Sequence, residues 1–405
     1  MTFKEIQLQE ILDIQWGDTK TTKASYVSEG YLAYSAKGPD GFLDKYDYDK
    51  EGIVLSAIGA NCGSTFYASG KWSCIKNTIR IFPKNDAVDL KYFFYMTKAP
   101  NFWPIRGSAQ PFISQTDIRE LYVQIPELRV QKMIGKILFE LEEKIAANNA
   151  LSKTLEDIAQ TIFKSWFIDF DPVKAREKGQ KPDGMSQKLA NLFPNSFAES
   201  ELGMIPAGWE CISLGTLCET LLGGTPSRAK EEFWNGEIPW INSGKVNEFR
   251  INTPTECITH TGLKHSATKL LPKGTTVLAI TGATLGQFSR LEIEACANQS
   301  VVGIIQSEKA SNEFIYLNIK NNIMRLISAQ TGGAQQHINK EDVNAFKIIY
   351  PGQELMSEFT SVVLEQFNQI GNLMTQNIVL SEMRDSLLPR LISGELQLPN
   401  EMLAS

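Results

Sequence analysis

Residues 54–63 read VLSAIGANCG, and residues 277–286 read VLAITGATLG. Each stretch is an apolar run typical of a buried strand, and each ends in a turn of the form Gly-Ala-x-x-Gly. The two stretches lie 223 positions apart in a chain of 405 residues. Because one such match can arise by chance, the rest of the chain has to decide whether it marks a duplication.

Two further pairs of segments repeat in the same order. GSAQPFIS at residues 107–114 matches GGAQQHIN at residues 332–339, and IQL at residues 6–8 matches ISL at residues 212–214. The order and the near-constant spacing predict a tandem duplication of a unit of about 200 residues.

Each predicted repeat has a strand-rich part followed by a helical part. In the helical part, apolar residues alternate three and four positions apart from Val130 to Ile162 and again from Phe359 to Leu391, just after Pro126 and Pro351. Such stripes predict either a helical hairpin inside a core or two long coiled-coil helices, and their matched lengths favour pairing with each other. The polar residues Lys144, Asn148 and Asn377 lie within the stripes and are expected to fix the register at some cost in stability.

These patterns predict an α+β chain with a pseudo-twofold internal repeat: two mixed α/β domains separated by two long helices that pair as an antiparallel coiled coil. The expected segments are a first domain at 1–126, a first long helix at 127–165, a linker at 166–205, a second domain at 206–350, a second long helix at 351–395 and a tail at 396–405.

The composition indicates a globular cytoplasmic protein. Hydrophobic residues make up 42% and charged residues 21% of the chain, which is ordinary for a folded protein. The N-terminal residues lack the apolar segment of a signal peptide, and no apolar run is long enough to span a membrane. The six cysteines form no Cys-x-x-Cys pair and are expected to be thiols in a reducing cytoplasm.

The net charge of −6 argues against a free-standing nucleic-acid-binding protein. Residues 351–405 hold 7 acidic and 2 basic side chains, so most of the negative excess lies in this last segment. If the chain binds DNA, local clusters of cations or a partner protein must supply the phosphate contacts.

Motifs for catalysis and for metal binding are missing from the sequence. The Gly-Ala-x-x-Gly turns lack the G-x-G-x-x-G arrangement of a dinucleotide site, and there is no Walker motif. Asp171-Pro172 lacks the second proline and aromatic residue of an adenine methyltransferase motif, so it is interpreted as a turn after a helix. Cys257, His260 and His265 lie close together but lack an evident fourth ligand. We therefore expect no catalytic site and no metal site.

Several longer segments resemble one known family. These segments are LGGTPSR at 222–228, FWNGEIPWI at 233–241, LLPKG at 270–274, KSWFIDFDPV at 164–173 and MRDSLLPRLISGE at 383–395. Together they resemble the specificity subunit of type I restriction–modification systems over essentially the whole chain. The first domain departs most, because it has WGDTK at 16–20 in place of the Gly-Gly-Thr-Pro segment.

The resemblance implies a DNA-reading subunit without chemistry of its own. Each domain would read one half of an asymmetric bipartite site in double-stranded DNA, and the helices would set the gap and hold two methyltransferase subunits. Restriction subunits would join for cleavage. S-adenosylmethionine would belong to the methyltransferase, and ATP and Mg²⁺ to the restriction subunit. The helix residues expected at subunit interfaces are Ile134, Leu141, Leu155, Val363, Ile370, Leu380 and Leu387.

Cations and amides in the loops of both domains are the candidate DNA-binding residues, because Arg, Lys and Asn contact phosphates and base edges. They are Lys20, Lys23, Lys37, Lys71 and Lys76 in the first domain, and Arg228, Lys230, Asn242, Lys245, Arg250, Lys264 and Lys269 in the second. Two other hypotheses remain: a scaffold that binds proteins rather than DNA, and an autonomous endonuclease or methyltransferase.

Overall fold

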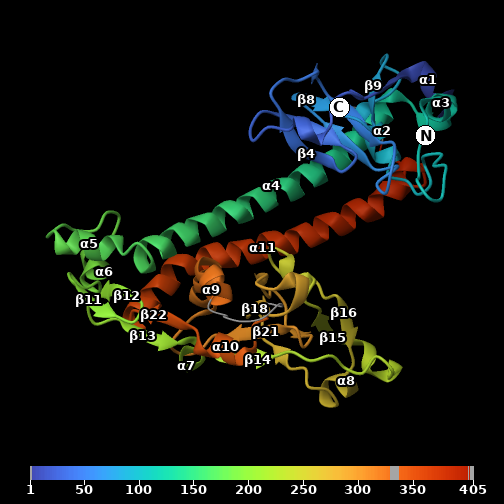
Figure 1. Cartoon of the computed structure of the whole chain (residues 1–405). Helices are drawn as coiled ribbons and strands as arrows, with labels where there is room; N and C mark the ends of the chain where they lie inside the picture. The colour runs from blue at the N-terminus through green and yellow to red at the C-terminus, as the bar shows by residue number, and fades with distance from the viewer. Residues whose placement is uncertain (1, 329–336, 400, 402–405) are drawn as a thin grey trace. The chain divides into compact units, whose positions relative to one another are not determined.

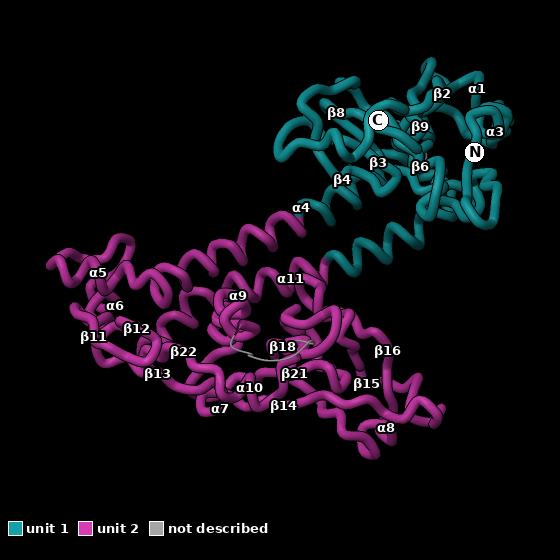
Figure 2. The backbone as a smooth tube through the Cα atoms, in the orientation of Figure 1, with its two compact units in different colours: residues 1–147, 377–405 teal, residues 148–376 magenta. Residues whose placement is uncertain are grey.

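The computed structural model describes residues 2–328, 337–399 and 401. It divides into two compact units, one formed by residues 1–147 and 377–405 and the other by residues 148–376 (Figure 2). Both boundaries fall inside long helices, α4 (Leu128–Phe167) and α11 (Gln353–Ile392). Residues 332–336, which begin the second copy of the repeated segment GGAQQHIN, lie outside the described residues. No helix in the described part of the chain is long and apolar enough to cross a membrane.

The first unit contains three sheets. The first has the order β2-β9-β6-β7 and is antiparallel throughout, with strands β2 (Leu12–Trp16), β9 (Thr78–Pro83), β6 (Gly52–Ser56) and β7 (Thr65–Ala68). The second has the order β4-β3-β8-β5, with strands β4 (Gly38–Leu43), β3 (Tyr31–Ser35), β8 (Lys71–Cys74) and β5 (Tyr48–Asp49), of which β3 and β8 are parallel. Strand β1 (Phe3–Gln7) pairs with β10 (Tyr122–Pro126).

The corresponding part of the second unit repeats these three sheets in the same order. The first is β14-β21-β18-β19, formed by β14 (Glu219–Leu222), β21 (Val301–Ile305), β18 (Thr276–Ala279) and β19 (Phe288–Arg290). The second is β16-β15-β20-β17, formed by β16 (Glu256–Ile258), β15 (Trp234–Ile241), β20 (Ala295–Ala297) and β17 (Leu270–Leu271), and β15 and β20 are parallel. Strand β13 (Glu210–Ser213) pairs with β22 (Lys347–Tyr350). The predicted duplication is confirmed.

Helices that are shorter than α4 and α11 connect these strands in both units. The first unit has α1 (Leu8–Ile11), α2 (Leu90–Met96), α3 (Gln115–Glu120) and the 3₁₀ helix η1 (Lys23–Ser25). The second has α7 (Leu214–Leu217), α8 (His260–Lys264), α9 (Asn312–Ser328) and α10 (Lys340–Ala345), with 3₁₀ helices η2 (Glu231–Phe233), η3 (Lys245–Asn247) and η4 (Gly282–Thr284). Ser and Thr side chains accept hydrogen bonds at the start of α3 and α8, as N-cap residues do.

Helices α4 and α11 pack together in antiparallel fashion within each unit (Figure 1). In the first unit, Ile134 of α4 and Leu391 of α11 belong to the same buried cluster. In the second unit, the rings of Phe163 and Phe359 lie 5.8 Å apart, and Asn148 Nδ2 donates to Gln376 Oε1 over 2.7 Å. The first half of each helix therefore pairs with the second half of the other.

The predicted apolar stripe of α4 is wrong in its second half. After Asn148 the buried positions of α4 are Ser152, Glu156, Ala159, Phe163, Trp166 and Phe167, whereas Leu151 and Ile158 are 47% and 45% exposed. A strict 3.5-residue repeat drifts around a helix of 3.6 residues per turn, so a stripe extrapolated from Val130 leaves the buried face. Apolar side chains are consequently left on the outer side of α4.

The mid-chain segment, assigned to a linker from the sequence, folds onto the second unit. It forms α5 (Asp171–Glu177), α6 (Gln187–Asn191) and the hairpin β11 (Phe197–Ser200)–β12 (Gly203–Pro206). Phe193 is fully buried against Trp166, with ring centroids 5.2 Å apart. Arg176 Nη1 donates to the carbonyls of Ala190 and Asn191 over 3.1 Å, which closes the segment on itself.

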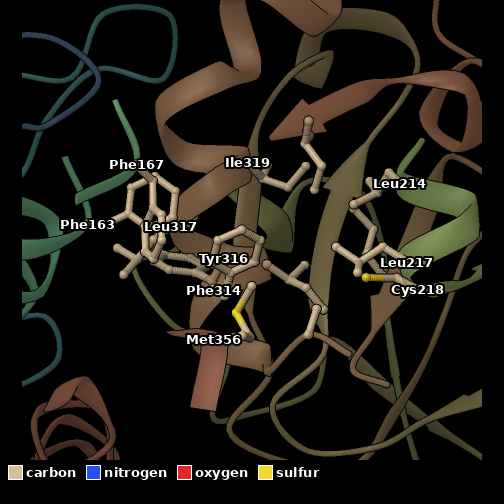
Figure 3. Close-up of a cluster of buried hydrophobic side chains, with 14 of the residues drawn as sticks. Phe163, Phe167, Leu214, Leu217, Cys218, Phe314, Tyr316, Leu317, Ile319 and Met356 are labelled. Atoms are coloured by element: carbon tan, nitrogen blue, oxygen red, sulfur yellow. The ribbon is translucent and has the colours of Figure 1, made fainter. Parts of the chain in front are cut away.

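The core of the second unit joins α4, α7, α9 and α11 (Figure 3). Phe163 and Phe167 of α4 contact Phe314 of α9 with ring centroids 5.6 and 5.4 Å away. Leu214 and Leu217 of α7 complete the same cluster. Helix α9 thereby holds the strand-rich part of the unit against the long helices.

Candidate nucleic-acid interface

The loop that follows strand β2 in the first unit begins in the same way as the loop that follows strand β14 in the second unit. Gly17 N donates to Thr78 O over 2.9 Å and Asp18 N to Cys74 O over 2.9 Å. In the second unit, Gly223 N donates to Val301 O over 2.9 Å and Gly224 N to Ala297 O over 2.8 Å. WGDT at 16–19 is therefore the structural equivalent of LGGT at 222–225, although their sequences differ.

Close packing of backbone explains why a glycine recurs at this junction. A Cβ on Gly17 would lie 2.7 Å from Cys74 O, and a Cβ on Gly223 would lie 2.5 Å from Ala297 O. Both distances are shorter than a carbon and a carbonyl oxygen tolerate. The junction fixes where each loop leaves its sheet, and thus where the loop's cations are presented.

Three predicted lysines of the first unit line one open cavity. Lys23, Lys37 and Lys76 come from three different loops and surround a volume of about 550 Å³, together with Asn61 and Asn77. Such a grouping of ammonium and amide donors suits a phosphate backbone and base edges. The structure brings these three lysines together, as a DNA-contacting surface requires.

The other two predicted lysines lie outside this cavity. Lys71 begins strand β8, whereas Lys76 follows the other end of that strand, and Lys71 Nζ lies 4.8 Å from the centre of the Tyr46 ring. Lys20 is exposed in the loop after Gly17, where its backbone N donates to Asp18 Oδ1 over 2.9 Å.

The equivalent loops of the second unit carry different side chains. Gln299 follows β20 at the position where Lys76 follows β8, and its Oε1 accepts a hydrogen bond of 2.5 Å from Thr225 Oγ1. Asn242 follows β15, and its Oδ1 accepts from Lys245 N over 3.1 Å. Lys245 Nζ is held by Thr253 at 3.0 Å and by Glu248 at 2.8 Å.

Arg228 is the most elaborately positioned cation of these loops. Its guanidinium lies 3.6 Å from the centre of the Trp234 ring and donates to both carboxylate oxygens of Glu256 over 2.8 and 2.6 Å. These hydrogen bonds hold the pKa of Glu256 below its usual value. The side chain of Arg228 is nevertheless 54% exposed, so it is oriented and accessible at once.

Lys23 has a similar arrangement in the first unit. Its Nζ forms an ion pair with Asp40, which also accepts hydrogen bonds of 2.8 Å from Tyr26 Oη and Ser35 Oγ. Burial raises the pKa of Asp40, but these hydrogen bonds and the charge of Lys23 outweigh burial, and the pKa is lowered. The pKa of Asp40, like that of Glu256, therefore lies below its usual value.

Arg250 does not belong to the candidate interface, which corrects the prediction from sequence. Its side chain is fully buried, with Nη2 2.5 Å from Glu156 Oε2 and Nη1 2.7 Å from Tyr316 Oη. Because the guanidinium is enclosed by its partners, it cannot reach a base or a phosphate. In the sequence, the apolar residues Val246 and Ile251 near Arg250 indicate a buried segment, and both are buried in the structure.

The remaining predicted cations of the second unit are exposed near β15–β17. Lys230 Nζ lies 4.9 Å from the centre of the Phe233 ring, Lys264 ends α8, and Lys269 precedes β17. His265 stacks on Phe233 at 6.1 Å. Within the described ranges, no three His, Cys, Asp or Glu side chains are grouped so that they could hold a metal ion.

The residues predicted for subunit interfaces divide into two sets. Ile134, Val363 and Ile370 are fully buried inside this chain, so they are not available to another subunit, which corrects the prediction for these three. The other four, which keep partial exposure, are Leu141, Leu155, Leu380 and Leu387. Leu151 and Ile158, which the apolar spacing places between the paired helices, are instead exposed on the outer side of α4.

Comparison with known proteins identifies the family. The model described as "Type I restriction modification DNA specificity domain" matches residues 1–157 and again 206–375, the two copies seen in the fold. The chain belongs to the family of type I restriction–modification specificity subunits.

Individual relatives agree with this assignment. The type I restriction enzyme HindI specificity subunit of Haemophilus influenzae is 30% identical over 335 residues, covering 72% of each chain. The MjaIX specificity subunit of Methanocaldococcus jannaschii is 25% identical over 356 residues, covering 86% of this chain and 78% of the relative. The crystal structure of an S subunit from M. genitalium has the same fold, with a TM-score of 0.64 at 16% identity and 96% coverage of both chains.

Proposed function

We propose that this chain is the non-catalytic DNA-reading subunit of a type I restriction–modification complex. Each recognition unit reads one half of an asymmetric bipartite site, and α4 and α11 set the gap between the halves. The complex acts in the cytoplasm. S-adenosylmethionine is bound by the methyltransferase subunits, and ATP and Mg²⁺ by restriction subunits that join for cleavage.

The observation that carries the proposal is different chemistry at equivalent positions of the two units. Lys76 in the first unit corresponds to Gln299 in the second, and Asn61 of the Gly-Ala-x-x-Gly turn corresponds to Thr284. An ammonium group, an amide and a hydroxyl prefer different base edges. Two heads with the same backbone and different loop side chains are suited to reading two different half-sites.

The outer side of α4 supports the docking of methyltransferase subunits. Leu151 and Ile158 are 47% and 45% exposed, and Leu155 and Ile162 lie on the same side with partial exposure. The spacing of four, three and four residues places all four side chains in one stripe of the helix. A helix of a partner protein can cover an apolar stripe of this kind. We propose that one methyltransferase subunit docks on this stripe and that a second subunit docks in the other half of the complex.

A gel-shift experiment tests the proposal. The chain is co-purified with the methyltransferase subunits from its own system and mixed with a pool of random duplexes. The proposal predicts enrichment of duplexes that share two short fixed elements separated by a gap of constant length. If the complex enriches no sequence, the proposal fails and a protein-binding scaffold becomes the better explanation.

A further inference from the structure

An exposed ion pair recurs at the same place in both units. Lys23 pairs with Asp40, and Arg228 pairs with Glu256. In each case the cation lies a few residues after the glycine that both units have at the end of the first strand, Gly17 or Gly223. The carboxylate lies on the edge strand of the second sheet, β4 or β16.

The registers of the two sheets support this correspondence. Ala33 of β3 pairs with Gly41, next to a bulge that contains Asp40. Ala33 also pairs with Ser73 in the parallel strand β8, and Trp240 of β15 pairs with Cys296 at the equivalent place in the parallel strand β20. On its other side, Trp240 pairs with Glu256. Asp40 and Glu256 therefore occupy neighbouring positions of equivalent strands.

The residue types differ between the pairs, whereas the arrangement is kept. A lysine and an aspartate form one pair, and an arginine and a glutamate form the other. A contact to a particular base should differ between heads that read different half-sites, whereas a contact to phosphate is common to both. Both units have a cation at this place, a lysine in one and an arginine in the other, so its expected partner is a phosphate of the DNA backbone rather than a particular base.

Exposure sets these pairs apart from the buried ion pairs of the chain. The two side chains are 51% and 23% exposed in the Lys23–Asp40 pair and 54% and 42% exposed in the Arg228–Glu256 pair, whereas those of Arg250 and Glu156 are 0% and 3% exposed. Exposed ion pairs contribute little to stability, so their cations can change partners at small cost. A buried pair cannot exchange in this way, because its separation leaves unpaired charge in the core.

We propose that Asp40 and Glu256 act as exchangeable anionic partners that occupy Lys23 and Arg228 until a DNA phosphate replaces them. The inference rests on the proposed function of the chain. In the free protein, each carboxylate orients its cation and neutralises it. On DNA, the phosphate takes the cation, and the released carboxylate repels the backbone unless the specific contacts of the loop compensate. The carboxylates thus weaken binding to DNA of arbitrary sequence more than binding to the target.

The experiment measures fluorescence anisotropy of the complex with methyltransferase subunits on a random duplex and on the duplex enriched by selection. Salt is varied from roughly 50 to 200 mM, the range in which phosphate contacts change affinity strongly. The variants are Glu256→Gln and Asp40→Asn, each compared with Arg228→Ala and Lys23→Ala. Glu199→Gln on β11 and Glu10→Gln on α1 are charge-matched controls, because both side chains are exposed outside the candidate loops.

We expect Glu256→Gln and Asp40→Asn to tighten binding to the random duplex about threefold or more, with a smaller gain on the target and no gain for the controls. Arg228→Ala and Lys23→Ala should weaken binding to both duplexes and reduce the salt slope by about one each. In the Arg228→Ala background, Glu256→Gln should tighten binding less than in the wild type, because competition for the guanidinium is gone and only the repulsion between Glu256 and the backbone remains to be relieved.

Two results would overturn the inference. If the carboxylate variants weaken binding as much as the cation variants do, the carboxylates support the bound state rather than compete with DNA. If they tighten random binding no more than the controls, they have no role in exchange. A wild-type complex that prefers no duplex would instead reject the proposed function, whatever the variants do.

Discussion

Arg250 Nη2 lies 2.5 Å from Glu156 Oε2, and both side chains are buried in the second unit. Glu156 belongs to α4, whereas Arg250 belongs to the strand-rich part of the unit. Tyr316 Oη and Lys320 Nζ of α9 also lie within hydrogen-bonding distance of Glu156 Oε1, at 3.1 and 2.5 Å. One carboxylate of α4 therefore joins this helix to the strand-rich part and to α9 of the second unit through three partners.

Glu156→Gln is expected to destabilise the second unit. The substitution keeps the size of the side chain but removes the negative charge that Arg250 and Lys320 share, so that Arg250 keeps only Glu292, at 3.7 Å. Breaking a buried pair costs about 3–5 kcal/mol. Urea unfolding of the purified complex measures the change. Asp157→Asn is the matched control, because Asp157 is the exposed neighbour on the same helix and should change the free energy of unfolding little. Equal effects of both variants would refute the anchoring role.

Replacement of Lys23, Lys37 and Lys76 by alanine is expected to weaken DNA binding through the first unit. Each lost phosphate contact should lower the salt slope by about 0.9, so the loss of Lys23 and Lys37 would change it by roughly 1.8, whereas Lys76 is proposed to contact a base edge and its loss should reduce selectivity. Anisotropy titrations at several salt concentrations measure this slope. Lys71→Ala is the control, because Lys71 lies at the other end of β8. A triple variant with the slope of the wild type would exclude this cavity as a DNA contact.

Gly17→Ala and Gly223→Ala are expected to destabilise their respective units by about 1–3 kcal/mol, since overpacking forces backbone shifts. A methyl group on either residue would meet the carbonyl oxygen of the last residue of a strand, Cys74 of β8 or Ala297 of β20. Thermal unfolding of each variant measures the loss. Gly244→Ala is the comparison, because the nearest atom to its Cβ would be Asn242 Oδ1 at 3.2 Å. If all three variants unfold alike, the close approach has no energetic consequence.

Leu151→Asp combined with Ile158→Asp is expected to release the methyltransferase subunit without unfolding the chain. Both side chains are nearly half exposed, so the fold loses little when they become polar, whereas an apolar interface would have to bury two new charges. Co-purification with tagged methyltransferase measures the association, and Lys153→Asp on the same helix is the control for an added negative charge. Undiminished recovery of the double variant would place the docking surface elsewhere.

Sequence patterns predicted the architecture well because the duplication preserves short local signals. The strand-and-turn segments at 54–63 and 277–286 form equivalent strands β6 and β18 with their turns. The paired helices followed from the apolar spacing. Register within α4 did not follow, because the buried charge of Glu156 is compensated by Arg250 and Lys320, which are distant in sequence. The apolar spacing predicts an exposed side chain at a glutamate such as Glu156, because its ion-pair partners cannot be recognised from the local sequence.

The candidate interface was predictable by residue type but not by geometry. Lys23, Lys37 and Lys76 are ordinary surface lysines in the sequence, and only the fold of three loops brings them to one cavity. Arg228 was selected for its loop position, but its contacts with Trp234 and Glu256 depend on strands formed later in the chain. Arg250 has a similar position in the sequence but is buried. Position in a loop therefore does not distinguish an exposed cation from a buried one.

Single-molecule sequencing of host DNA tests the central claim most directly. The chain is co-expressed with its methyltransferase subunits, and methylated adenines are mapped with the wild type, with the chain deleted, and with the Lys23, Lys37 and Lys76 triple variant. The account predicts a split, asymmetric methylated motif that disappears on deletion and loses selectivity in one half only with the variant. Methylation that persists unchanged without this chain, or both halves changing together in the variant, would contradict it.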